Sequence, residues 1–149
     1  MRRAWAALVL TLAPGLAAAA MRCDVTVLPF VFGLYAPGDP VPLDVTGSVD
    51  VRCVGTPGTF FATLSPGTSG SFAQRYMLSG ASRMNYNLYV NPGRTLIWGD
   101  GTGGSLPIGR NKVRSGRDDF SLPIYGRVPP GQSVGAGAYA DDVIVTVVF

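Results

Sequence analysis

The sequence predicts a single all-β domain, and three observations lead to that prediction. Glycine and proline are abundant, with 20 and 12 residues among 149, and they supply many turns. Charged residues make up only 14% and apolar residues 47%, which is typical neither of a disordered chain nor of a helical bundle. After Met21, no window of eleven residues sustains the 3.6-residue period of an amphipathic helix.

Eight segments have the character of β-strands. Residues 24–32 alternate around Val25 and Val27, and residues 46–53 place Val49, Val51 and Cys53 on one face. The other segments are runs of aromatic and branched residues bounded by turn residues, namely 59–64, 75–78, 84–90, 96–98, 120–128 and 142–149. No linker, charge block or internal repeat separates them, so we expect one domain over residues 21–149.

The last predicted strand is apolar on both of its faces. One face carries Val143, Val145, Val147 and Phe149, and the other carries Asp142, Ile144, Thr146 and Val148. A strand of this kind is either buried on both sides or is covered by another chain.

Residues 1–20 have the pattern of a secretory signal peptide. Two arginines precede the apolar run of residues 4–12, and small residues at 17–20 predict cleavage after Ala20. The apolar run is too short for a spanning helix, so we expect a chain that does not span the membrane. Arg22 precedes Cys23, which argues against a lipid anchor on that cysteine. The predicted location is therefore outside the cytoplasm, reached through the periplasm.

Cys23 and Cys53 are the only cysteines of the chain. An oxidising compartment allows them to pair, and we predict one intramolecular disulfide between them rather than two free thiols. The bond would close a loop of about 30 residues and stabilise the fold by roughly 3 to 4 kcal/mol on the chain-entropy model.

The composition argues against an enzyme. The chain contains no His and no Glu, which excludes a Ser-His-Asp triad, a His-containing zinc site and a Glu general acid. The net charge of +3 falls to +1 once Arg2 and Arg3 are removed, so nucleic acid is not an expected partner. The cations between residues 110 and 117 lack interleaved aromatic residues, and Asp118 and Asp119 follow them, so we interpret them as a solvated loop.

Two motifs are discounted as cofactor or metal sites. Gly99, Gly101 and Gly104 match G-x-G-x-x-G, but the residues that follow cannot open a helix, so a mobile glycine-rich turn is expected. The acidic doublets at 118–119 and 141–142 could supply a carboxylate pair or a calcium site. Neighbouring residues of a strand point to opposite faces, which favours solvated positions instead. We expect no cofactor.

Seven short motifs, in this order, resemble the spore coat protein U domain family. They are FG at 32–33 with Tyr35, GSVDVRC at 47–53, YNLY at 86–89, WGDG at 98–101, YGRVP at 125–129, GQ at 131–132, and GAYAD at 137–141 leading into the terminal strand. The resemblance covers nearly all of residues 23–149.

This resemblance implies a structural subunit of a cell-surface assembly, either an archaic chaperone-usher pilus or a coat. It implies an incomplete immunoglobulin-like sandwich that lacks its last strand and is completed by strand donation. The implied partners are a periplasmic pilus chaperone, an outer-membrane usher and neighbouring subunits. The implied groove lies between the first and last strands, at Val25, Val27, Phe30, Phe32, Val143, Val145, Val147 and Phe149.

The chain departs from the pilin pattern at its start. Cleavage after Ala20 would leave only Met21 and Arg22 before Cys23, which is too short to donate a strand, so a tip or minor subunit is expected rather than a shaft subunit. Two alternatives stay open. The signal peptide and the terminal Phe149 would also suit a small outer-membrane β-barrel, and Asp118 or Asp119 could serve a secreted hydrolase.

Overall fold

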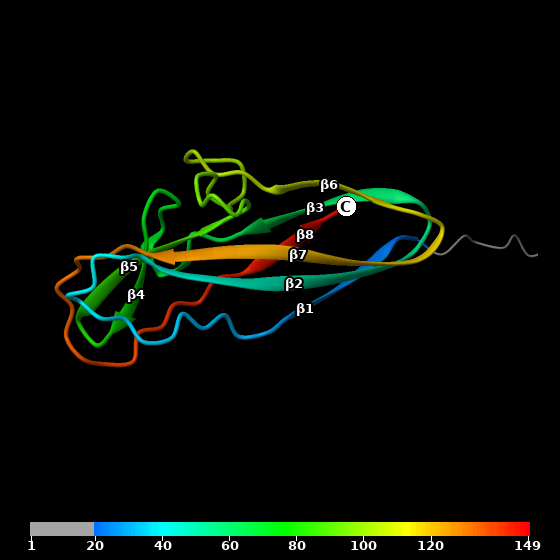
Figure 1. The fold of residues 1–149 in the computed structure, drawn as a ribbon. Helices are drawn as coiled ribbons and strands as arrows, with labels where there is room; N and C mark the ends of the chain where they lie inside the picture. The colour runs from blue at the N-terminus through cyan, green and yellow to red at the C-terminus, as the bar shows by residue number, and fades with distance from the viewer. Residues whose placement is uncertain (1–19) are drawn as a thin grey trace, which may run out of the picture.

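The computed structural model describes residues 20–149, and the fold it shows is all-β, as predicted (Figure 1). Eight strands and one short 3₁₀ helix, η1 (Gly67–Ser69), are present in this part of the chain. The strands are β1 (Arg22–Val27), β2 (Leu43–Gly55), β3 (Gly58–Leu64), β4 (Arg75–Ser79), β5 (Ser82–Tyr89), β6 (Ile108–Val113), β7 (Gly116–Val128) and β8 (Val145–Val148).

The strands form two sheets of unequal width. The larger sheet has the order β1-β2-β7-β5-β4, and the smaller has the order β6-β3-β8. The strand pairs within them are antiparallel, and the long β2–β7 ladder runs from Leu43 opposite Val128 to Gly55 opposite Gly116. The smaller sheet therefore covers only part of the inner face of the larger one.

The core forms where the two sheets face each other. Val49, Val51, Leu122 and Ile124 contribute from β2 and β7, and Phe60, Ala62 and Leu64 contribute from β3. The ring of Phe60 contacts that of Phe120 edge-on, with centroids 5.0 Å apart. The predicted disulfide is confirmed, since Cys23 and Cys53 lie directly opposite each other on β1 and β2 and are bonded.

Expectations about three segments were wrong. The strand expected over residues 24–32 ends at Val27, so Phe30 and Phe32 lie outside it. Residues 96–98 form isolated bridges instead of a strand, with Ile97 opposite Tyr89 and Trp98 beside Leu106. The segment with cations between residues 110 and 117 was expected to be a solvated loop. It belongs instead to the hairpin of β6 and β7. The sequence of β6, IGRNKV, places few apolar residues at alternating positions, because β6 is an edge strand that pairs only with β3.

A buried arginine joins β4 to the surrounding chain. Arg75 is fully buried, and its guanidinium donates hydrogen bonds to the Ser65 carbonyl (2.8 Å), the Trp98 carbonyl (2.8 Å) and Asn87 Oδ1 (2.6 Å). Burial lowers the pKa of Arg75, and these acceptors satisfy the charge. The network fixes β3, β4, β5 and the loop before Trp98 against one another.

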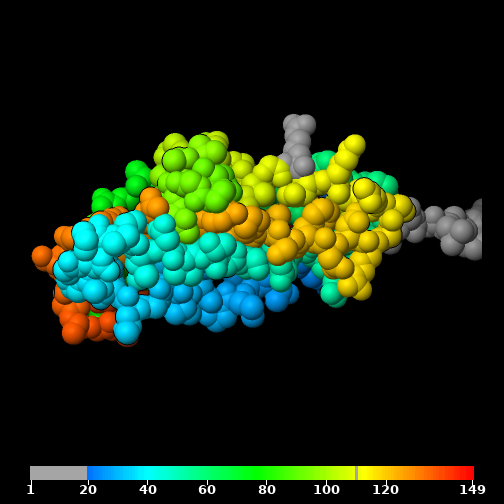
Figure 2. Space-filling view, viewed as in Figure 1, coloured from blue at the N-terminus to red at the C-terminus, as the bar shows by residue number. Residues whose placement is uncertain are grey.

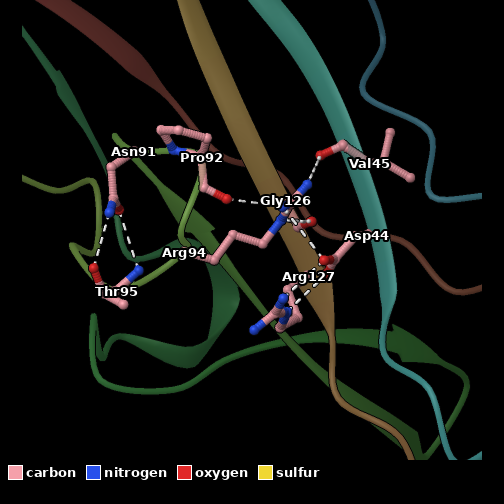
Figure 3. Close-up of polar contacts among 8 residues, drawn as sticks. All are labelled: Asp44, Val45, Asn91, Pro92, Arg94, Thr95, Gly126 and Arg127. Carbon is pink, nitrogen blue, oxygen red and sulfur yellow. Dashed lines mark hydrogen bonds and ion pairs between the residues drawn. The ribbon is translucent and has the colours of Figure 1, made fainter.

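A second polar cluster lies on the outer face of the larger sheet (Figure 3). Arg127 forms a two-point ion pair with Asp44 at 2.7 Å, and Arg94 approaches the same carboxylate at 3.3 Å. Arg94, with φ of 52°, also donates to the Gly126 and Val45 carbonyls. The loop after β5 is thereby fastened across β7 to β2.

Within residues 20–149, no helix is long and apolar enough to cross a membrane.

Candidate functional site

A cavity of about 870 Å³ opens along one side of the sandwich. One wall is formed by Val27 and residues 30–35, and the opposite wall by residues 134–143 with Val145. Its floor is apolar and comes from the larger sheet and the end of β3, at Leu43, Leu64, Met77, Met84, Leu88, Ile124 and Val128. Figure 2 shows that residues 28–42 (blue to cyan) and 129–141 (orange) gather at the same end of the molecule.

The first wall is a segment that forms no ladder of backbone hydrogen bonds with a described strand. β1 stops at Val27, and among the described residues no backbone hydrogen bond joins residues 28–35 to another segment. The segment is held by its side chains, because Phe30 and Phe32 point inward onto glycines of β2 and β7. A Cβ at Gly47 would lie 2.8 Å from the Phe30 ring, and one at Gly126 only 2.6 Å from it, so a side chain at either position would displace the ring.

The second wall is β8 with the residues that precede it. β8 pairs with β3 along one edge, and no described strand pairs with its other edge. The Ser65 N–H donates to the Ile144 carbonyl at 2.9 Å. Hydrogen-bonded and non-hydrogen-bonded pairs alternate along an antiparallel ladder. The main-chain N–H and C=O groups of Val143, Val145 and Val147 therefore face the open edge of β8. The side chains of these three valines pack against the core.

The inner face of β1 is only partly covered. Val25 and Val27 pair with Val51 and Val49, so the four side chains share the inner face of the sheet. Val49 and Val51 are 0% and 1% exposed, whereas Val25 and Val27 are 38% and 46% exposed. The smaller sheet ends at β8, and beyond it no described strand lies over β1. The sandwich is therefore one strand short at this position.

A carboxylate fixes the end of the second wall. Asp141 accepts hydrogen bonds from the Tyr86 hydroxyl (2.7 Å), the Thr68 N–H (2.8 Å) and the Asp142 N–H (3.0 Å). Burial and the bond to Asp141 raise the pKa of Tyr86, so the phenol remains a donor. Asp141 thus acts as a clasp between η1, β5 and the chain that leads into β8.

The structure brings together five of the eight residues expected to form the groove. Val27, Phe30, Phe32, Val143 and Val145 line the cavity. Val25 lies beside it on β1, Val147 packs against the core, and Phe149 is 59% exposed and does not line it. Met84, Tyr86 and Leu88 also line the cavity and were missed, although their alternation within β5 could have indicated a shared inner face.

The discounted motifs have structural roles. Asp118 accepts a hydrogen bond from the Arg114 N–H, and Asp119 pairs with Arg52 and Arg117 on the outer face. The glycine-rich segment is a turn, closed by the bond from the Ser105 N–H to the Thr102 carbonyl at 2.9 Å, and no helix follows it. Residues 20–149 contain no cluster of three metal-ligating side chains.

Comparison with known proteins agrees with this architecture. The chain is 33% identical over 135 residues to Protein U of Myxococcus xanthus, a match that covers 79% of this chain and 70% of that protein. Its fold is similar to a chain in the crystal structure of the CsuC-CsuE chaperone-tip adhesion subunit pre-assembly complex of Acinetobacter baumannii, from archaic chaperone-usher Csu pili. That likeness has a TM-score of 0.58 at 20% identity and covers 87% of this chain.

The present chain spans only 40% of the length of that Csu chain, so the likeness concerns the fold of one region. The family model of the Spore Coat Protein U domain matches residues 6–146, nearly the whole chain. The protein therefore belongs to the Spore Coat Protein U domain family, as its sequence motifs indicated.

Proposed function

We propose that this protein is an exported structural subunit of a pilus or coat at the cell surface, and that a strand from another chain completes its sandwich. The incoming strand would lie in the cavity, between residues 28–35 and β8. The observation that carries the proposal is the exposure of Val25 and Val27 on the inner face of β1, where their paired neighbours are buried.

Both walls of the cavity offer unused main-chain groups to such a strand. Residues 28–35 have no backbone partner among the described residues, and β8 has one free edge. A single extended segment could pair with both walls and place alternate side chains on the apolar floor. Strand addition of this kind combines ladder hydrogen bonds with side-chain pockets.

The outer edges of β4 and β6 are blocked against pairing with another strand, whereas the free edge of β8 is not. β6 carries Lys112 and Asn111 along its edge, and the outer edge of β4 is occupied where Leu78 and Ala140 exchange backbone hydrogen bonds of 2.8 and 3.0 Å. Charged residues and covering segments are the usual means of blocking edge pairing. β8 has the sequence VTVV and lacks such protection.

An inserted strand would contribute a large share of the stability. Burying about four apolar side chains stabilises by roughly 6 to 12 kcal/mol, at about 1.5 to 3 kcal/mol each. The net stability of an ordinary domain is about 5 to 15 kcal/mol. The isolated chain should therefore be marginally stable and prone to aggregate.

The proposed completion of the groove implies three kinds of partner. A periplasmic chaperone would fill the groove after export, an outer-membrane usher would direct assembly, and neighbouring subunits would supply the final strand. The solved Csu complex supports a chaperone partner, because it contains a chaperone bound to a subunit of similar fold. A tip or minor position is proposed on the predicted cleavage after Ala20. N-terminal sequencing tests that position, and a mature start ten or more residues earlier contradicts it.

Strand complementation can be tested with a synthetic seven-residue peptide of alternating Val and Thr. Its length matches residues 141–147 of the second wall, about 23 Å of extended chain. We expect the peptide to raise the melting temperature of the mature chain and to suppress its aggregation.

The variants Val145→Asp and Thr146→Asp separate groove binding from a general effect of charge. Val145 faces the cavity and Thr146 is exposed on the same strand, so only the first should abolish the response to peptide. The proposal is wrong if the unmodified mature chain is a stable monomer that neither the peptide nor a chaperone stabilises further.

A further inference from the structure

Two methionine sulfurs lie in the floor of the groove. Met77 on β4 and Met84 on β5 lie directly opposite each other in the β4–β5 ladder, so their side chains share the inner face of the larger sheet. Both line the cavity, and they are 8% and 7% exposed. Met1 belongs to the predicted signal peptide, and Met21 does not line the cavity. Two of the three methionines of the mature chain are therefore gathered at one place.

The empty groove gives small solutes access to these two sulfurs. The cavity of about 870 Å³ is open along one side and has room for many water molecules, each of which takes up about 30 Å³. Hydrogen peroxide is little larger than water and enters the same space. Peroxide oxidises a thioether to a sulfoxide, whereas the aliphatic side chains that share the floor, such as Leu64 and Leu88, do not react with it.

Methionine is also suited to a floor that receives an incoming strand. Its side chain is unbranched and has three rotatable bonds, so it adapts to the shape of whatever packs on it. Under the proposed function, the same floor receives a chaperone first and a neighbouring subunit afterwards. The flexible side chains of Met77 and Met84 allow the floor to accept both partners, and their thioethers make it sensitive to oxidation.

The groove offers few hydrogen-bond donors to a sulfoxide in its floor. The hydroxyls of Tyr86 and Tyr139 line the cavity but already donate, to the Asp141 carboxylate and to the Gly135 carbonyl. The Tyr35 hydroxyl belongs to the first wall, where it accepts a hydrogen bond from a backbone N–H. An inserted strand would therefore bury the sulfoxide oxygen, a hydrogen-bond acceptor, among the aliphatic side chains of the floor, and this burial opposes binding of the strand.

We propose that Met77 and Met84 form an oxidation site that disables the empty groove, and that an inserted strand protects them. The oxidant is hydrogen peroxide. The thioether sulfur attacks one peroxide oxygen and gives up two electrons, so that an S–O bond forms as the O–O bond breaks. The hydroxide released takes the proton of the transferred hydroxyl and leaves as water, and the sulfoxide remains. This inference rests on the proposed function, and it adds that peroxide inactivates a subunit with an empty groove but spares a subunit whose groove is filled.

The first measurement is the rate at which hydrogen peroxide oxidises the mature chain, with and without the alternating Val-Thr peptide. Mass spectrometry of tryptic fragments reports each sulfur separately, because Arg83 lies between Met77 and Met84 in the sequence. With the peptide at ten times its Kd, about one chain in eleven has an empty groove, so both methionines should be oxidised about tenfold more slowly. Met21 lies outside the cavity and is the internal reference, whose rate should not change.

The second measurement is the affinity of the peptide, read from the rise in melting temperature that it causes, before and after peroxide treatment. Oxidation should weaken the affinity about tenfold, while the circular dichroism of the β-sheets persists. The variant Met77→Leu with Met84→Leu should respond to the peptide equally before and after treatment. The matched control Met21→Leu keeps both groove sulfurs, and its affinity should fall on oxidation as that of the unmodified chain does.

The outcomes separate the oxidation site from the proposed function. A peptide that does not raise the melting temperature of the untreated chain overturns the proposed function. Where the untreated chain does respond, three results overturn the oxidation site: oxidation rates of Met77 and Met84 that the peptide leaves unchanged, an affinity that survives their oxidation, or a general loss of β-structure on oxidation.

Discussion

The central strand β7 and the edge strand β1 of the larger sheet carry similar apolar residues but are covered differently. At β7, Leu122 and Ile124 are buried, at 5% and 4% exposure. At β1, Val25 and Val27 face the same side and remain 38% and 46% exposed. The alternation of apolar residues is therefore equally good on both strands, and the difference lies in how much of the chain covers each of them. The proposed function assigns this partly covered face of β1 to a strand from another chain.

The largest expected effect compares one side chain from each region. Phe60→Ala should cost about 3 to 5 kcal/mol of unfolding free energy, because the ring is 1% exposed and packs on Phe120. Val27→Ala should cost less than about 1 kcal/mol in the free chain, since much of the side chain is already in water. Urea unfolding of the free chain measures both values.

The same pair should behave differently once the groove is filled. With the Val-Thr peptide in excess, Val27→Ala should lose more stability than it does in the free chain, while the loss for Phe60→Ala should stay the same. Equal losses for Val27→Ala with and without peptide would show that the peptide does not cover β1.

Sequence patterns predicted the buried strands of the fold better than its edges. The strand at 46–53 and its inward-facing residues were predicted correctly, because alternation alone determines them. β6 was missed, since an edge strand with polar residues resembles a loop. The burial of Arg75 could not be predicted, because its acceptors Ser65 and Trp98 are brought to it only by the tertiary fold. The Asp141 clasp depends in the same way on Thr68, 73 residues away in sequence.

The disulfide should matter most for the edge strand β1. Replacing both Cys23 and Cys53 by Ser should lower the unfolding free energy by roughly 3 kcal/mol, because 30 residues separate the cysteines. β1 has six residues and a half-covered inner face, so its ladder to β2 should open first in the variant. Amide hydrogen exchange would locate the loss: faster exchange confined to β1 and its partner residues in β2 is expected. Uniform acceleration across β7 would contradict this assignment.

The smallest expected effect concerns the outer face, far from the groove. The hydrogen bond from Arg127 holds the pKa of Asp44 below its usual value, with a smaller contribution from Arg94. A lowered pKa means that the ionised carboxylate stabilises the fold above pH 4, and that this stabilisation disappears as the pH falls through the pKa of the folded state. Asp44→Asn should therefore cost about 0.5 to 1 kcal/mol at pH 7, because the pair is partly exposed to solvent. The cost should be smaller at about pH 2.5 than at pH 7, because the carboxylate takes up its proton as the pH falls through the pKa of the folded state. Asp50→Asn, on the same face of β2 but without an ion-pair partner among residues 20–149, is the matched control and should change little at either pH. Equal costs for Asp44→Asn at both pH values would mean that the carboxylate contributes through packing rather than through its charge.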